Sequence, residues 1–394
     1  MAMNNLKATK VTAEEIRRDP KILDGRSVTG DMEEKLSLKD MTINKATLVD
    51  FRAIRSRISN VVFNDCRFIK ANFRLSEFEN VTFNGGSMAY QGDSQQEENL
   101  TNFEDSIFKG QIIFNKVKFD LVYLYGVGSK ESVCRVLFKD MRQINNKDRF
   151  ATIQGYGINL RVDNCLREGD IFGSLDENST VYATNSTFIN SGFAGNRTKT
   201  IYIENCELLK GSSGGAAVTM VIKNSIVAGA LFGQLSKKAY LINNKYPGNG
   251  PGLTSLGGGP GLEIFIDGQG VKEARMNILS GQVTVKDLEL IKPMIGKVFD
   301  YQVKTLNLKN VILRGPNFEE LRLESGTWEK VEIYPPARVP DTVFVNLRVH
   351  QVTFPKGKPW VEATSKSSVN LIESPTPFDW PEISVPTPKD LDLE

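Results

Sequence analysis

Residues 54–83 read IRSRISNVVFNDCRFIKANFRLSEFENVTF, and an apolar residue stands at every fifth position of this stretch. The same spacing begins further upstream and covers ten consecutive positions, namely Leu38, Ile43, Leu48, Ala53, Ile58, Phe63, Phe68, Phe73, Phe78 and Phe83. An amphipathic helix needs spacings of three and four, and a half-buried strand needs a spacing of two. A period of five fits neither, so the stretch is an internal repeat.

Mostly small side chains stand two residues before these positions, namely Ala46, Ser56, Val61, Cys66, Ala71, Ser76 and Val81, with Phe51 as the exception. The pattern resembles the pentapeptide-repeat family over residues 36–113. The resemblance implies a right-handed β-helix in which four pentapeptides form one square coil, with the Leu or Phe and the small residue inside. Phe103 and Phe108 resume the phase, so we expect residues 84–102 to form one irregular coil or a surface excursion.

A second repeat occupies the middle of the chain, where asparagines end five strand-like segments at intervals of 21, 20, 19 and 20 residues. These asparagines are Asn164, Asn185, Asn205, Asn224 and Asn244. Within each segment apolar residues alternate with a mixed set, as a strand with one buried face requires. Asparagine tolerates the left-handed backbone of a tight turn, and its amide can bond to the coils above and below. We therefore predict stacked coils with an asparagine ladder.

Together the repeats predict an all-β fold, a right-handed parallel β-helix solenoid with a short N-terminal helical cap. Thr12 and Glu15 have the spacing of a capping box at the start of a helix over residues 12–18. A solenoid core grows along an axis, so the chain length does not require several globular domains. The predicted parts are a cap at 1–35, pentapeptide coils at 36–120, β-helix coils with the ladder at 121–247, a Gly-rich loop at 248–262, further coils at 263–373 and a Pro-rich tail at 374–394.

The composition argues against several classes of function. The 394 residues include one histidine, His350, so Ser-His-Asp, Cys-His and multi-histidine zinc chemistry lack their residues. The 49 basic and 47 acidic residues give a net charge of +2, which does not favour nucleic acid as a partner. The same balance argues against the DNA-mimic role of some pentapeptide-repeat proteins. We expect no cofactor and no metal site, and a structural role for His350.

The sequence shows no run of apolar residues long enough for a transmembrane helix and no recognisable signal peptide. The compartment therefore stays open, and removal of a signal peptide would place the protein in the periplasm or at the cell surface. For partners we predict a protein or a polysaccharide. For the oligomeric state we predict a monomer or an end-to-end dimer.

One outward column of the ladder coils is a candidate binding surface. Its residues are Arg161, Tyr182, Tyr202, Val221 and Leu241. If exposed, the column forms an apolar stripe of the kind that marks a partner surface. The other interpretation is that a loop, such as residues 248–261, covers it. We therefore predict a non-enzymatic scaffold or binding protein that presents an elongated face to a protein or glycan.

The alternative function is polysaccharide cleavage or binding at the outward face near Asp163 and Glu204, with Lys223 beside them. Two coils separate the backbones of the two acids by about 9.6 Å. Their side chains could narrow this gap to the separation that inverting glycosidases use. The other interpretation is a solvated face of alternating charge. The same two-coil separation places Cys165 and Cys206 too far apart for a disulfide.

Overall fold

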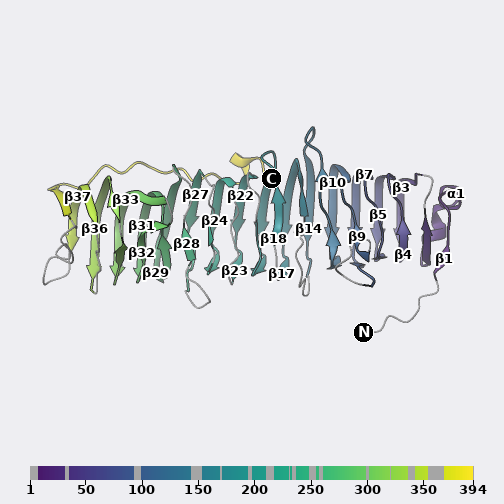
Figure 1. Ribbon diagram of the computed structural model, residues 1–394, viewed down its shortest axis with the longest axis horizontal. Coiled ribbons are helices and arrows are strands. Elements are labelled where there is room, and N and C mark those ends of the chain that lie inside the picture. The colour runs from purple at the N-terminus through teal and green to yellow at the C-terminus, as the bar shows by residue number, and fades with distance from the viewer. Residues whose placement is uncertain are drawn as a thin grey trace. The chain divides into compact units, whose positions relative to one another are not determined.

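The computed structural model describes residues 8–31, 35–92, 99–142, 153–168, 171–193, 198–209, 217–229, 231–232, 237–247, 254–256, 261–298, 301–319, 321–335, 342–353 and 368–393. The chain divides into two compact units, Met1–Thr187 (unit 1) and Phe188–Glu394 (unit 2). Each unit is an all-β, right-handed parallel β-solenoid in which successive coils add strands to the same sheets (Figure 1). The predicted fold class is therefore confirmed.

Unit 1 begins with the predicted helical cap. Helix α1 (Ala13–Arg18) starts at Thr12, whose hydroxyl accepts a hydrogen bond from the Glu15 N–H. The Glu15 carboxylate in turn accepts from the Thr12 N–H at 2.8 Å, which completes a capping box. Ile16 is buried, and the short 3₁₀ helix η1 (Pro20–Leu23) follows. A six-residue helix is too short to be stable alone, so it depends on this packing.

The strands of unit 1 form parallel sheets along the faces of the solenoid. The longest sheet contains β3 (Ser37–Asn44), β5 (Arg57–Asn64), β7 (Glu77–Asn84), β10 (Ile107–Asn115), β14 (Cys134–Lys139), β16 (Ile158–Asp163) and β19 (Thr180–Thr184). A second contains β1 (Thr9–Lys10), β2 (Ser27–Asp31), β4 (Thr47–Arg52), β6 (Arg67–Ile69), β8 (Ser87–Ala89) and β11 (Lys118–Asp120). The shorter strands are β9 (Thr101–Asn102), β12 (Val122–Tyr123), β13 (Val127–Gly128), β15 (Ile153–Tyr156), β17 (Leu166–Glu168), β18 (Ile171–Leu175) and β20 (Thr187–Ile189).

The core of unit 1 follows from the period of five. All ten positions of the repeat are buried, as the spacing predicts. Parallel strands lie about 4.8 Å apart, so identical side chains stack from coil to coil. Phe83 lies between Phe63 and Phe114, with ring centroids 5.2 Å and 5.0 Å away. Phe103 stacks on Phe73 at 5.4 Å, thirty residues earlier, so this coil is longer than the twenty-residue coils before it. Residues 93–98 of the coil lie outside the described part of the chain.

An asparagine ladder that the sequence analysis missed runs along the end of the long sheet of unit 1. Asn64 donates its side-chain amide to Asn44 at 3.1 Å, and Asn84 donates to Asn64 at 3.2 Å. Asn115 continues the series with a 2.8 Å bond to Asn84. The signal in the sequence was the spacing of twenty residues between the first three asparagines.

Four of the five predicted asparagines stand at left-handed turns, but their amides do not form the predicted chain of amide-to-amide bonds. Asn164, Asn185 and Asn224 donate instead to carboxylates on the preceding coil, namely Asp140, Asp163 and Glu204. Asn164, Asn185, Asn205 and Asn224 adopt left-handed backbone angles, with φ between 50° and 54°. The fifth position is Asn243, with φ 51°, and its amide donates to the Asn224 side chain at 2.8 Å.

The prediction of Asn244 as the fifth ladder residue is wrong, because the coil that precedes it has nineteen residues rather than twenty. Asn244 is buried, donates to the Ile222 carbonyl at 2.8 Å and accepts from the Ser225 N–H at 2.9 Å. The same shift moves Leu241, which pairs with Ile222 and faces the core. Leu241 therefore does not belong to the outward column.

Unit 2 repeats the plan with more aliphatic coils. Its longest sheet contains β22 (Thr198–Glu204), β24 (Ala217–Lys223), β27 (Lys238–Ile242), β29 (Glu263–Ala274), β31 (Gly281–Ile291), β33 (Tyr301–Arg314), β36 (Ser325–Tyr334), β37 (Val343–Thr353) and β38 (Ser368–Glu373). The others are β21 (Gly192–Phe193), β23 (Glu207–Leu209), β25 (Ile226–Ala228), β26 (Leu231–Phe232), β28 (Thr254–Leu256), β30 (Met276–Ile278), β32 (Met294–Val298), β34 (Asn317–Glu319) and β35 (Arg322–Leu323). No helix in the described ranges is long and apolar enough to cross a membrane.

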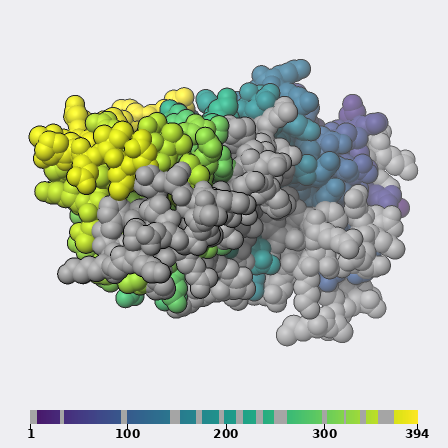
Figure 2. Space-filling model, turned by 60° about the vertical axis from the view of Figure 1, so that its left-hand side comes forward, coloured from purple at the N-terminus to yellow at the C-terminus, as the bar shows by residue number. Residues whose placement is uncertain are grey.

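After β38 the chain leaves the solenoid as an extended tail, residues 374–393. Five prolines lie in residues 374–394, and proline has no N–H to give to a sheet. The tail runs back along unit 2 from β37 toward β22, ending near the short 3₁₀ helix η3 (Lys389–Leu391) (Figure 1). In Figure 2 yellow residues lie against the yellow-green surface of the later coils. The predicted tail is extended, and it is docked on the solenoid.

Candidate ligand groove on the outward face of unit 2

The outward face of unit 2 has one central column of side chains, built by the parallel register of its long strands. The central outward column, in chain order, is Tyr202, Val221, Tyr240, Phe265, Thr284, Asn307, Thr327 and Arg348. Each residue belongs to the next strand of the sheet, so the column has one side chain per coil. Its first four members are apolar or aromatic and its last four are polar.

The predicted binding residues fall into three environments. In unit 1, Arg161 is exposed and its guanidinium lies 5.4 Å from the ring centre of Tyr182 on the next strand. In unit 2, Tyr202 and Val221 face outward, yet they are only 2% and 0% exposed. Leu241 lies in the core, as described above. The members of the predicted stripe that belong to unit 2 are thus buried.

The loop that was predicted as a cover, residues 248–261, is described only in part. Residues 254–256 form β28, which pairs with β26 and β30 in another sheet. Residues 248–253 and 257–260 lie outside the described part of the chain. A described segment that runs along the outward face is the tail, whose Glu382, Ile383 and Ser384 line one groove with Tyr240 and Phe265 (Figure 1).

The tail is anchored through a buried carboxylate. Glu329 is 3% exposed, and its Oε2 accepts hydrogen bonds from the Phe378 N–H at 2.8 Å and from the Trp380 indole at 3.0 Å. Burial alone would raise the pKa of Glu329, but these two donors, with Lys309 and His350 nearby, hold that pKa below its ordinary value. The ionised carboxylate is therefore the form that holds the tail.

Ring contacts complete the anchor. The guanidinium of Arg348 lies 4.6 Å from the ring centre of Phe378, and the ammonium of Lys309 lies 5.4 Å from the ring centre of Trp380. His350 packs edge-on against Phe378, and its Nδ1 is 2.9 Å from the carbonyl oxygen of Ser374. The single histidine thus has a structural contact with the tail.

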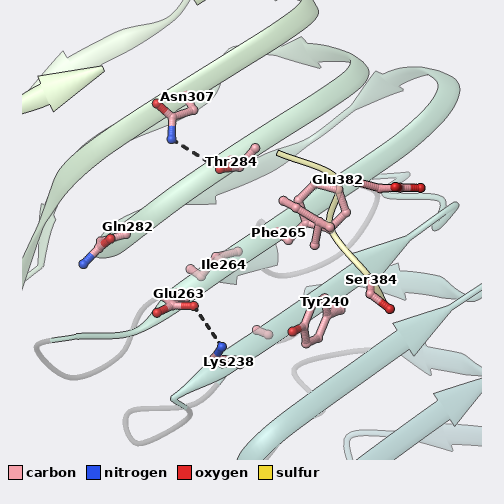
Figure 3. A pocket seen from close by; sticks show the side chains of 12 residues that line it. Lys238, Tyr240, Glu263, Ile264, Phe265, Gln282, Thr284, Asn307, Glu382 and Ser384 are labelled. Atoms are coloured by element: carbon pink, nitrogen blue, oxygen red, sulfur yellow. Dashed lines mark hydrogen bonds and ion pairs between the residues drawn. The ribbon is translucent and has the colours of Figure 1, made fainter. Parts of the chain in front are cut away.

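Beyond the anchor, the tail and the strands enclose a groove of about 340 Å³ (Figure 3). The strand side includes Tyr240 and Phe265, and the tail side is formed by Glu382, Ile383 and Ser384. The groove thus has two half-buried aromatic side chains on one side and a carboxylate and a hydroxyl on the other. This concave site combines apolar surface with polar side chains, as ligand sites do.

The polar side chains of the groove are arranged in pairs. The Lys238 ammonium lies 3.4 Å from the Glu263 carboxylate, and the Asn307 amide lies 3.4 Å from the Thr284 hydroxyl (Figure 3). With Glu382 the lining has one lysine and two glutamates, a net charge of −1. The lining is thus suited to hydrogen bonding with an uncharged, hydroxyl-rich ligand rather than to an anion.

The two acids of the predicted catalytic alternative are each held by neighbours in their own unit. In unit 1, Asp163 accepts hydrogen bonds from the Thr184 hydroxyl at 2.9 Å and the Asn185 amide at 3.1 Å. In unit 2, Glu204 lies 3.5 Å from the ammonium of Lys223. These are the contacts of a face of alternating charge. Within the described ranges, no group of three or more His, Cys, Asp or Glu side chains could hold a metal ion.

The cysteines are free thiols, and all four are buried. Burial raises the pKa of the Cys66 thiol to about 11 and that of the Cys134 thiol to about 12. A thiol must ionise to act as a nucleophile, so these side chains serve as small core residues.

The groove and the tail anchor were missed by the sequence analysis, although one signal was present. Phe378 and Trp380 stand on either side of Asp379 inside the Pro-rich tail, and a spacing of two is the period of an extended chain with one buried side. Nothing in the local sequence of β36 marks Glu329 as the partner of this segment.

The fold defines the class of protein, which is a right-handed parallel β-helix protein with a docked C-terminal tail. No family model matches the sequence, and a search of curated proteins finds no similar sequence. Among solved structures, the chain is similar to the periplasmic alginate epimerase AlgG at 8% sequence identity and a TM-score of 0.29. The match covers 87% of this chain and 83% of that chain, and at this score it transfers no substrate or activity.

Proposed function

We propose that the protein is a non-enzymatic binding protein that holds an extended, uncharged glycan chain along the outward face of unit 2. The observation that carries the proposal is the groove, where Tyr240 and Phe265 lie beside amide and hydroxyl side chains. A sugar ring has apolar C–H faces and a rim of hydroxyl groups. The aromatic surfaces suit the faces and the polar pairs suit the rim.

The direction of the groove favours a polymer over a small ligand. Strands of a parallel sheet follow each other every 4.8 Å or so, which is near the rise of one sugar in an extended chain. A linear glycan that lies along the column would meet Tyr240, Phe265, Thr284 and Asn307 on successive strands. A scaffold role for unit 1, whose residues 36–113 resemble pentapeptide repeats, belongs to the same proposal.

The contacts of the acidic side chains support binding rather than cleavage. An inverting glycosidase needs one carboxylic acid and one carboxylate whose pKa values differ, with room for a water between them. In the groove, Glu263 is paired with Lys238. Asp163 and Glu204 are paired with side chains on adjacent strands.

The test is binding of the full chain to neutral and anionic polysaccharides, measured by affinity electrophoresis and calorimetry, beside a reducing-end assay. We expect saturable binding to a neutral polysaccharide without product release. Tyr240→Ala and Phe265→Ala should each weaken it roughly tenfold, about 1.4 kcal/mol. Tyr156→Ala, which removes a 40% exposed tyrosine in unit 1, is the matched control and should bind normally.

Two results would overturn the proposal. One is the absence of binding to every polysaccharide in the panel. The other is turnover that disappears in Glu204→Gln, because that result assigns the activity to the outward acids instead.

A further inference from the structure

The docked tail has two parts that are held in different ways. The anchor, residues 374–380, is bound to the strands by the hydrogen bonds to Glu329 and by the ring contacts described above. The arm, residues 382–393, makes its described hydrogen bonds within itself. Thr387 donates to Asp390 at 2.7 Å, and the Leu393 N–H donates to the Pro388 carbonyl at 2.9 Å. Among the described residues, no hydrogen bond joins the arm to a strand.

Apolar contact therefore holds the arm on the solenoid. Ile383, Val385 and Leu391 are half-buried and Leu393 is buried, whereas Glu382 and the other polar residues of the arm are exposed. Contact of this kind is not directional, so another apolar surface of similar shape can replace it.

The end of the arm reaches the level of the solenoid at which the apolar part of the central outward column begins (Figure 1). On β22 and β24 the inward positions are Ile201, Ile203 and Met220, so Tyr202 and Val221 face outward. Both are nevertheless buried, and Figure 1 shows the tail reaching the level of these strands. The column continues from there into the groove.

We infer that the arm is a displaceable cover over a second stretch of ligand-binding surface, formed by Tyr202 and Val221, and that a long uncharged glycan displaces it. This inference rests on the proposed function of the groove. A short glycan fills the groove beside Tyr240 and Phe265, where the arm lines one wall. A longer one extends along the column toward β22 and takes the place of the arm, while the anchor at Glu329 keeps the tail attached.

The affinity for the long glycan is then reduced by the fraction of molecules whose arm is closed, because the closed arm blocks part of the site. The short glycan does not compete with the end of the arm, so its affinity is independent of it. The difference between long and short ligands is therefore the signature of a cover, as opposed to a simple structural clasp.

The experiment compares the full chain with a chain that ends at Val385, which keeps the anchor and the groove wall. The probes are a β-1,4-linked glucose disaccharide and hexasaccharide, with binding measured by calorimetry. We expect the shortened chain to bind the hexasaccharide roughly tenfold more tightly and the disaccharide equally well. Hydrogen exchange of the full chain should show faster exchange at residues 389–393 when the hexasaccharide binds, and no change with the disaccharide.

A point variant and its control separate loss of the arm's apolar contact from other effects of shortening the chain. Leu391→Ser, on the half-buried side of the arm, should reproduce the gain for the hexasaccharide, and Lys389→Ala, on the exposed side, should not. Equal hexasaccharide affinity in the full and shortened chains, or weaker binding after shortening, overturns the cover while the groove still binds. Absence of binding to both probes in every variant, together with failure of the polysaccharide panel, overturns the proposed function instead.

Discussion

The outward faces of the two units differ, although both are built on the same parallel register. In unit 1 the outward side chains form lateral ion pairs, such as Arg57 with Glu77 at 3.2 Å and Lys109 with Glu77 at 3.1 Å. In unit 2 the outward face has an apolar and aromatic column, and residues 382–384 of the tail lie across a groove from its Tyr240 and Phe265. The difference teaches that the solenoid supplies only a regular spacing. The side chains at the outward positions decide whether a face is solvated or binds a partner.

The interiors differ as well. Unit 1 stacks phenylalanine rings from coil to coil, as Phe63, Phe83 and Phe114 show. Unit 2 uses aliphatic side chains such as Val285 and Leu308 at the corresponding inward positions. A ring stack buries more area per coil, so the two interiors should respond differently to truncation of one side chain.

The largest expected effect is in the ring stack. Phe83→Ala should lower the free energy of unfolding of unit 1 by about 3–5 kcal/mol, because it removes a buried ring and its stacking contacts with Phe63 and Phe114. Leu308→Ala is the matched change in unit 2 and should cost about 2–3 kcal/mol. Hydrogen exchange under increasing denaturant measures each unit separately. A larger loss for Leu308→Ala would contradict the view that the ring stack dominates unit 1.

The next effect concerns the tail anchor. Glu329→Gln removes the charge from the acceptor of the Phe378 and Trp380 hydrogen bonds and should weaken docking by about 1–2 kcal/mol. Limited proteolysis within residues 374–393 measures the opening of the tail. Glu324→Gln, an exposed carboxylate on the same unit, is the control. Equal cleavage rates in the wild type and Glu329→Gln would mean that the carboxylate is not the anchor.

The same contact should make docking depend on pH. The pKa of Glu329 is lowered in the folded protein, so the stabilisation that its carboxylate gives to the docked tail is complete above the ordinary pKa of a glutamate. It is lost as the pH falls through the lowered value. Trp380 fluorescence, with Trp380→Phe as the blank, should therefore report release of the tail at acid pH. In Glu329→Gln this acid transition should disappear, and its persistence would assign the transition to another group.

The smallest effect is expected on the charged rows. Lys223→Ala removes an ion pair with Glu204 whose lysine is 40% exposed, and Lys109→Ala removes a similar pair in unit 1. Exposed pairs contribute little, so each change should alter stability by less than about 0.5 kcal/mol in chemical denaturation. A loss above about 2 kcal/mol in either variant would show that these rows are structural rather than solvated.

Most of the solenoid was predictable because it depends on short-range regularity. The period of five placed Leu38 to Phe83 in the core, and the capping box placed helix α1. The asparagine spacing found four left-handed turn residues. Each of these features depends either on a few neighbouring residues or on a spacing that recurs from coil to coil, so the pattern along the chain carries the information.

The sequence by itself did not determine where one coil is a residue shorter, since both Asn243 and Asn244 satisfy the turn preference. Only the packing of the coil selects Asn243 for the turn and turns Leu241 inward. Nor did it place the tail, because the partners Glu329 and Trp380 are 51 residues apart and share no repeat. Local period determined the solenoid, whereas long-range contact decided the register of one coil, the cover on the outward face and the groove beside it.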